Sequence, residues 1–203
     1  MAAYGRPTLR DLFDGAPTPH IAHPPETHHR DFYLATDGSF RESCVGLGAL
    51  IETRDGERVA RLAVPTESPD NNVAEYRALH LGLGVLAARS PPGVRVGLLL
   101  DHDQLAANVN ASVLAAREAP LGAHHQVSVS SDRHWRDIRD HLEDFAEVRA
   151  ARIDSSHNPA HPLANAPEEY AHVNDEPDRC VLPETPGTDP IPPPSRSNRG
   201  ASD

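Results

Sequence analysis

Several acidic side chains stand directly after apolar runs that predict strands, and another begins a long helical pattern. These acids are Asp37 after residues 32–36, Asp101 and Asp103 close after residues 94–100, and Glu75 in the first turn of residues 71–89. Carboxylates at the ends of neighbouring strands, joined by one from a packed helix, form a hard oxygen site that suits Mg²⁺ or Mn²⁺. Two such ions about 4 Å apart activate a water and stabilise the leaving oxygen in phosphodiester cleavage.

The elements that position these acids follow from hydrophobic periodicity and turn residues. The pattern predicts three antiparallel strands, then a helix that crosses to a fourth strand, and predicts an α/β fold in the order β-β-β-α-β-α-α-β-α. The expected strands are residues 32–37, 45–53, 58–64, 94–100 and 148–153, and the expected helices are residues 71–89, 103–117, 134–145 and 159–173.

The two ends of the chain differ from this patterned middle. Residues 1–30 carry five prolines with little apolar periodicity, and the C-terminal segment includes DPIPPPSRSNRGASD. Such composition is typical of disordered or extended chain. We therefore expect an N-terminal tail over residues 1–30, one domain over residues 31–173 and a C-terminal tail over residues 174–203.

Charge and cysteine content exclude several classes. The 19 basic residues are all Arg and face 30 acidic residues, a net charge of -11. An acidic chain is not a nucleic-acid binder by bulk charge. It suits a halophilic cytoplasm, although GC-rich coding also favours Arg over Lys. Cys44 and Cys180 cannot build a disulfide framework or zinc ribbon. With no apolar run of about 20 residues and no apolar signal core, a cytoplasmic protein without a membrane span is expected.

Four segments resemble one enzyme family. Residues 36–40 (TDGSF) resemble the first motif of type 1 ribonuclease H in its archaeal-like form, and residues 71–79 (NNVAEYRAL) resemble the second. Residues 98–108 and 156–165 are similar to the third and fourth motifs. The resemblance implies a ribonuclease H-like mixed five-stranded sheet with three antiparallel strands followed by parallel strands, and helices on both faces. It also implies two-metal cleavage of the RNA strand in RNA–DNA hybrids.

Two histidines depart from the motifs of this family. His102 stands where the third motif has its metal-binding Asp, and His161 stands at the usual last Asp. Because Asp101 and Asp103 flank His102, a one-residue change in where the strand ends restores a carboxylate. The implied ligands are then Asp37, Glu75, Asp101 or Asp103, and His161. A neutral imidazole leaves three anionic ligands, so we expect weaker Mg²⁺ binding or a preference for Mn²⁺. If His102 faces the site instead, only Asp37 and Glu75 remain as anions.

His157 admits several interpretations. It stands four residues before His161, on the same helical face if that segment is helical. With Asp103, the two histidines form a possible zinc set, though a polar residue near a helix N-terminus is the favoured interpretation. The family also has a mobile His that aids product release, and His157 is a possible counterpart. A further cluster of histidines lies in the Pro-rich N-terminal segment and indicates adventitious metal binding at most: His20, His23, His28 and His29.

Two further segments bear on partners. Residues 6–13 resemble a sliding-clamp-binding peptide through Leu9, Leu12 and Phe13, although a short amphipathic turn packed on the domain is favoured. Trp135 has helical spacing and is expected in the core. Near it, Arg133, Arg136 and Arg139 alternate with acidic residues, which indicates a solvated face rather than a hybrid-binding surface.

Two functions from different classes follow. The first is a metal-dependent ribonuclease H-like endonuclease, whose attraction to phosphate must come from bound ions and local groups such as Arg41 or Arg77. The second is a nucleic-acid or protein-binding module that keeps the fold and has lost its metals. The first two motifs favour the enzyme, whereas the two histidines favour the module.

Overall fold

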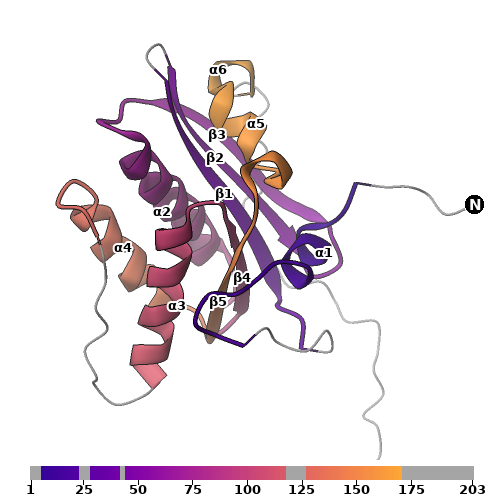
Figure 1. Ribbon diagram of the computed structural model, residues 1–203. Coiled ribbons are helices and arrows are strands. Elements are labelled where there is room, and N and C mark those ends of the chain that lie inside the picture. Colours follow the sequence, from indigo (N-terminus) through magenta and orange to yellow (C-terminus); the bar gives the residue numbers. More distant parts are fainter. Residues whose placement is uncertain (1–5, 23–27, 42–43, 118–126, 171–203) are drawn as a thin grey trace, which may run out of the picture.

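A five-stranded mixed sheet forms the centre of the computed structural model, which describes residues 6–22, 28–41, 44–117 and 127–170 (Figure 1). The strand order is β3-β2-β1-β4-β5. Strands β1, β2 and β3 are antiparallel neighbours, whereas β4 runs parallel to β1, and β5 runs parallel to β4. The strands are β1 (Phe32–Arg41), β2 (Cys44–Thr53), β3 (Arg58–Thr66), β4 (Arg95–Leu100) and β5 (Glu147–Arg152). This arrangement confirms the predicted fold class.

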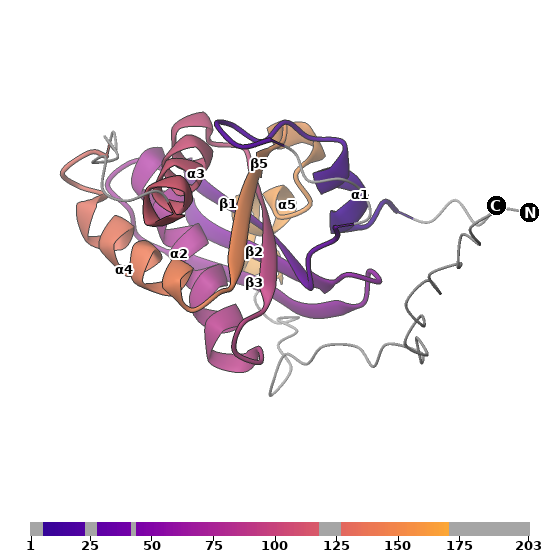
Figure 2. The same ribbon diagram turned by 90° about the horizontal axis from the view of Figure 1, so that it is seen from below.

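Helices cover both faces of the sheet (Figure 2). Three long helices lie on one face: α2 (Asn71–Arg89), α3 (Asp103–Arg117) and α4 (Asp132–Glu143). The other face carries α1 (Leu9–Asp14) and α5 (His161–Asn165), the latter followed by α6 (Pro167–Tyr170). The strand alternation explains the two layers, because successive side chains of a strand point to opposite faces. In β1, Phe32 and Leu34 join the core under α2, whereas Tyr33 and Ala35 join the smaller core under α1.

The predicted long helix over residues 159–173 is wrong in its extent. The chain instead forms a short turn of 3-10 helix, η1 (Ser155–His157), and then the separate helices α5 and α6. Ala166 has φ -134° and ψ 56°, so the helical path stops there. Pro167 follows it, and a residue that precedes proline is disfavoured in the helical region. Residues beyond 170 lie outside the described part of the chain, as does the expected C-terminal tail.

The N-terminal segment also differs from the expected tail. Residues 9–14 form α1, which Thr8 and Asp11 begin with a reciprocal capping box. Leu9 and Phe13 are each 1% exposed, and Phe13 packs edge-on against Tyr33. The favoured interpretation of an amphipathic turn packed on the domain is therefore confirmed. The sliding-clamp contact is unsupported, because Leu9 and Phe13 are committed to this core.

None of the helices in the described residues is both long and apolar enough to cross a lipid bilayer. The buried apolar side chains instead face the sheet, and Trp135 lies among them as predicted.

Candidate metal centre

Asp37 lies near the middle of the sheet on β1 and is 2% exposed. It continues the face of β1 that Tyr33 and Ala35 occupy, under α1 and α5. A buried carboxylate in this position has lost most of its hydration, and neighbouring groups must compensate for that loss.

Glu75 is brought near Asp37 and Asp101, whose charges act on it, because β1 and α2 approach closely at Gly38. It is not one of the three residues whose ligand atoms lie together in the described part of the chain. A Cβ at Gly38 would lie 2.2 Å from the carbonyl carbon of Ala74, so only glycine allows this contact. The Gly38 backbone N–H donates to Glu75 Oε2 at 3.1 Å. This hydrogen bond holds the Glu75 carboxylate against the strand that carries Asp37. Glu75 is the fifth residue of α2, so it lies just beyond the first turn in which the sequence placed it.

Asp101 is brought to the same place by parallel pairing. Ala35 of β1 pairs with Leu99 of β4, and two further residues along this register lead to Asp37 and Asp101. Asp101 follows the last residue of β4, Leu100. Its Oδ1 atom is buried and accepts no hydrogen bond from the described residues. A buried carboxylate oxygen without a donor is the kind of group that a cation satisfies.

His161 is positioned by a second close approach, on the opposite face from α2. Cβ atoms at Gly46 and Gly48 of β2 would lie 2.1 Å and 2.5 Å from backbone oxygens of the α5 segment. These glycines let α5 settle onto the sheet, and His161 Nδ1 lies 3.1 Å from Asp37 Oδ2. Asp37, Asp101 and His161 each offer one ligand atom, and these atoms all lie within 4.8 Å of one another.

The Asn165 amide, one helical turn further on, selects which ring nitrogen of His161 carries the hydrogen. The amide nitrogen of Asn165 lies 2.5 Å from His161 Nε2 and can only donate, so Nε2 accepts. Nδ1 then carries the ring hydrogen and donates to Asp37. In this orientation Ser39 Oγ donates to the Asn165 amide oxygen at 2.6 Å. To bind a cation through Nδ1, the ring must carry its hydrogen on Nε2, and the Asn165 amide must turn so that its oxygen accepts that hydrogen.

Burial and mutual repulsion dominate the electrostatics of the cluster. Burial, followed by the nearby Asp101 carboxylate, raises the pKa of Asp37 to about 8. Burial, followed by the charges of Asp101 and Asp37, raises the pKa of Glu75 to about 9. Like charges held close together away from water oppose ionisation. A divalent cation relieves this repulsion, so the residues present fit a hard metal ion.

The structure distinguishes among the three candidates at residues 101–103. Asp101 joins the cluster, whereas the Asp103 side chain is 74% exposed and pairs with Arg152. His102 points elsewhere: its Nδ1 accepts from the backbone N–H of Leu105 at 3.1 Å and so caps α3. Its ring also packs edge-on against Tyr76. His102 therefore lies outside the cluster that Asp37, Asp101 and His161 form.

His157 does not join the cluster. It lies exposed in η1, and α5 begins only at His161, so the two histidines do not share one helix. The possible zinc set of His157, His161 and Asp103 is not among the metal-ligand clusters found in the described part of the chain.

Three polar side chains around His161 escaped the sequence analysis: Ser155 and Asn165, which contact it, and Ser39, which donates to Asn165. Ser155 Oγ lies 3.1 Å from His161 Nδ1. Two of the three had a usable signal. Asn165 stands four residues after His161, which places it on the same helical face, and Ser39 stands two after Asp37, on the same strand face.

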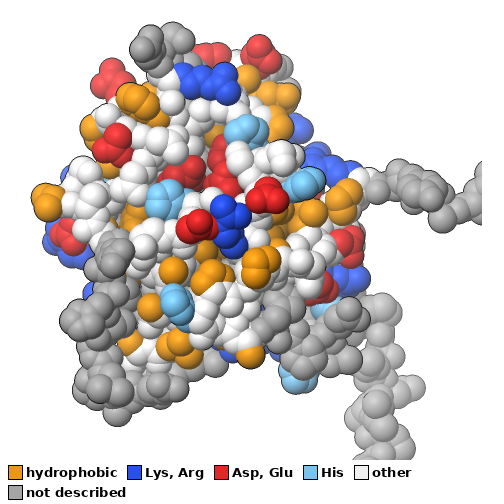
Figure 3. Space-filling view, in the orientation of Figure 1, with side chains coloured by type: hydrophobic (Ala, Val, Ile, Leu, Met, Phe, Trp, Pro, Cys, Tyr) orange, Lys and Arg blue, Asp and Glu red, His pale blue; other side chains and the backbone are white. Residues whose placement is uncertain are grey.

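Figure 3 shows acidic side chains and histidines gathered near the centre of one face of the molecule. His161 is the most accessible member of the cluster, with its side chain 39% exposed, whereas the Asp37 side chain is 3% exposed. A ligand therefore approaches from the α5 side of the cluster.

Comparison with solved structures identifies the fold. The chain is similar to the N-terminal ribonuclease H domain of a Mycobacterium tuberculosis protein, at 20% identity and TM-score 0.55, over 71% of this chain and 98% of that one. It is also similar to RNase H1 of the halophilic archaeon Halobacterium salinarum, at 20% identity and TM-score 0.52, over 68% and 97%. LC11-RNase H1 in complex with an RNA/DNA hybrid matches at 19% identity and TM-score 0.52, over 66% and 94%.

These matches define the class: the chain has a ribonuclease H-like fold, as the four motifs implied. No family model and no curated protein matches the sequence.

Proposed function

We propose that this chain is a metal-dependent ribonuclease H-like endonuclease, which cleaves the RNA strand of RNA–DNA hybrids by two-metal hydrolysis. The observation that carries the proposal is the convergence of Asp37, Asp101 and His161 within 4.8 Å, with Glu75 held beside them. The similarity to LC11-RNase H1, which was solved with an RNA/DNA hybrid, supports the choice of substrate.

Asp37, Glu75, Asp101 and His161 are the residues that would hold Mg²⁺ or Mn²⁺. Bound divalent ions would lower the pKa of an attacking water and stabilise the leaving oxygen. The carboxylates of Asp37, Glu75 and Asp101 would be ionised when they bind a metal ion. Their combined negative charge is what would attract the ions to the site. His161 contributes a neutral nitrogen in place of a fourth carboxylate, which favours Mn²⁺ over Mg²⁺.

Contact with the phosphate backbone falls to local cationic groups, because the net charge of -11 opposes association. Arg41 is suited to this role: it is exposed at the end of β1, four residues beyond Asp37. Arg77 is less suited, because its guanidinium already donates to Thr66 Oγ1 at 2.7 Å and to the Glu67 carbonyl.

A cleavage assay on labelled hybrid tests the proposal. The wild-type chain is incubated with the hybrid and with matched duplex RNA, in Mg²⁺ or Mn²⁺, at low and at molar salt. We expect cleavage of the RNA strand of the hybrid, faster in Mn²⁺, and a loss of roughly 100-fold or more in Asp37→Asn. Equal rates for the hybrid and for duplex RNA would refute the substrate, and full activity in Asp37→Asn would refute the site.

A binding module is the second candidate, and His161 is the observation that favours it. Because His161 stands in place of a carboxylate, the centre binds cations more weakly. A centre that no longer binds metal ions would leave a surface that binds nucleic acid or protein without cleavage. Hybrid retention on a filter without cleavage, equal in wild type and Asp37→Asn and unaffected by chelator, is the result expected of the module.

A further inference from the structure

A second cluster of ligand-type side chains lies between α2 and α4, apart from the acidic centre. It consists of His80 from α2 with His134 and Asp137 from α4. His80 stands five residues beyond Glu75, more than one helical turn away and on a different side of the helix. The nuclease proposal does not use these residues, and the inference below does not depend on it.

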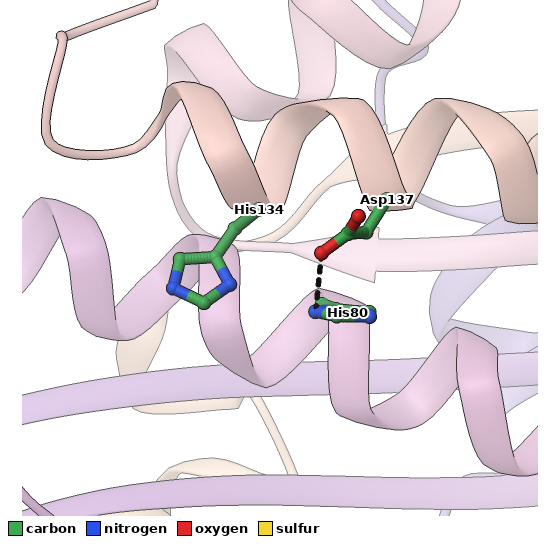
Figure 4. Close-up of side chains that lie close together, drawn as sticks. All are labelled: His80, His134 and Asp137. Carbon is green, nitrogen blue, oxygen red and sulfur yellow. Dashed lines mark ion pairs between the residues drawn. The ribbon is translucent and has the colours of Figure 1, made fainter.

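The three side chains converge on one point. His134 and Asp137 are three residues apart, so they lie on one face of α4. Figure 4 shows both reaching from α4 toward His80 on α2. His80 Nδ1 lies 3.8 Å from Asp137 Oδ2, and one ligand atom from each residue lies within 4.8 Å of the others.

The packing of the two helices holds this arrangement in place. Trp135 and Ile138 of α4 are buried in the core, and Trp135 packs edge-on against Tyr76 of α2 with ring centroids 6.2 Å apart. His134 and Asp137 directly precede these anchors, so they flank the seam between the helices. His80 is 33% and Asp137 is 42% exposed, which leaves the cluster reachable from solvent.

Both imidazoles favour the neutral form that binds metals. Burial is the main cause that lowers the pKa of His80 and of His134, and their proximity to other positive groups adds to it. His134 Nδ1 is buried and has no hydrogen-bond partner among the described residues. A buried ring nitrogen without a partner is unfavourable unless a ligand satisfies it.

We propose that His80, His134 and Asp137 form a second metal site, for a divalent transition ion of the zinc class, which fastens α4 to α2. Two nitrogens and one carboxylate oxygen suit Zn²⁺, whereas Mg²⁺ prefers oxygen alone. Tetrahedral Zn²⁺ places its ligand atoms about 3.3 Å apart. Side-chain rotations that move the ligand atoms by about 1 Å are therefore enough to bring them around one ion, with water as the fourth ligand.

Neighbouring charges moderate the affinity. Arg133 and Arg77 lie close enough to affect the cluster, and both oppose a cation. His141 stacks near His80, with ring centroids 5.5 Å apart, but its Nδ1 faces Asp144 Oδ2 at 3.5 Å. His141 is therefore a neighbour rather than a ligand, and it offers a matched control.

The test is a calorimetric titration of Zn²⁺ into the full chain in excess Mg²⁺, repeated with Co²⁺ to record the visible absorption of tetrahedral coordination. Wild type is compared with His134→Asn, Asp137→Asn and His141→Asn, so that the remaining histidines give a common background. We expect His134→Asn and Asp137→Asn to lose one site or to weaken it by at least about tenfold, with His141→Asn within about threefold of wild type.

Thermal melting provides the second readout. At about 100 times Kd, Zn²⁺ should raise Tm by roughly 5–10 °C in wild type and His141→Asn, beyond any shift in the two ligand variants. Melting without metal shows whether each variant is folded. If His134→Asn does not fold, Asp137→Asn alone carries the comparison with wild type. Unchanged binding in both ligand variants, or an equal loss in His141→Asn, would overturn the site.

Discussion

Asp37 and Glu75 hold their carboxyl groups where burial and neighbouring acids oppose ionisation. Their raised pKa values make the metal-free fold sensitive to pH. Between its ordinary pKa of 3.8 and about 8, Asp37 binds a proton more readily in the folded chain than in the unfolded one. Its contribution to stability is fully present below the lower pKa and is lost as pH rises through the higher one.

We therefore expect the metal-free protein to be less stable at pH 9 than at pH 7, by roughly 1–4 kcal/mol when both carboxyl groups are counted. Urea unfolding at the two pH values measures the difference. Asp37→Asn should reduce it, and saturating Mg²⁺ should do the same in wild type. A metal-free protein that gains stability over this range would contradict the electrostatic account.

His161 sets the charge of the centre, because its Nδ1 lies 3.1 Å from Asp37 Oδ2 where a fourth carboxylate would increase cation affinity. His161→Asp should tighten Mg²⁺ binding by roughly tenfold or more, since a hard anionic oxygen replaces a neutral nitrogen. It should also reduce the preference for Mn²⁺, and calorimetry with each ion measures both effects. His157→Asp is the matched control, because His157 is exposed outside the cluster. Equal gains in the two variants would indicate a general effect of charge.

Glycines act at the scale of elements, since they set how closely helices approach the sheet. Gly38 admits the backbone of α2, whereas Gly46 and Gly48 admit α5 on the other face. Each contact brings one ligand to Asp37: Glu75 from α2 and His161 from α5.

Gly38→Ala should destabilise the fold by about 1–3 kcal/mol, because the added methyl group meets the backbone of Ala74 and Glu75 rather than a movable side chain. It should also weaken metal binding by displacing Glu75. Gly15→Ala is the control, since its nearest neighbour would be 3.6 Å away and its φ is -87°. Urea unfolding and Mn²⁺ titration measure the two effects, and a Gly38→Ala protein as stable as wild type would contradict the close approach.

The sequence predicted the long elements well because their periodicity is local. The bounds of α2 and α3 match, and the strands differ by a few residues at most. Which of Asp101, His102 and Asp103 faces the metal centre could not be predicted from the sequence. That choice depends on where β4 ends and on the capping of α3 by His102, both of which tertiary pairing decides.

At the scale of the whole molecule, the N-terminal segment closes one face of the sheet. Composition alone predicted a tail here. It could not reveal contacts between residues far apart in the chain, such as the hydrogen bond from the Leu9 N–H to Glu52 Oε2. Phe13 is buried between α1 and the sheet, where it contacts Tyr33.

Phe13→Ala should lower the free energy of unfolding by about 3–5 kcal/mol, the usual cost of a cavity left by a buried aromatic ring. Leu12→Ala should cost less, because Leu12 is only partly buried. Chemical denaturation of the full chain measures both. Near-identical stability of Phe13→Ala and wild type would show that α1 is not part of the fold.

The most direct test of the metal centre is a Mn²⁺ titration that compares Asp101→Asn with Asp103→Asn. Both variants remove one negative charge beside β4, but only Asp101 lies with Asp37 and His161. We predict that Asp101→Asn abolishes saturable Mn²⁺ binding at this centre, and that Asp103→Asn binds as wild type does. Equal binding in the two variants, or a loss confined to Asp103→Asn, would contradict the centre described above.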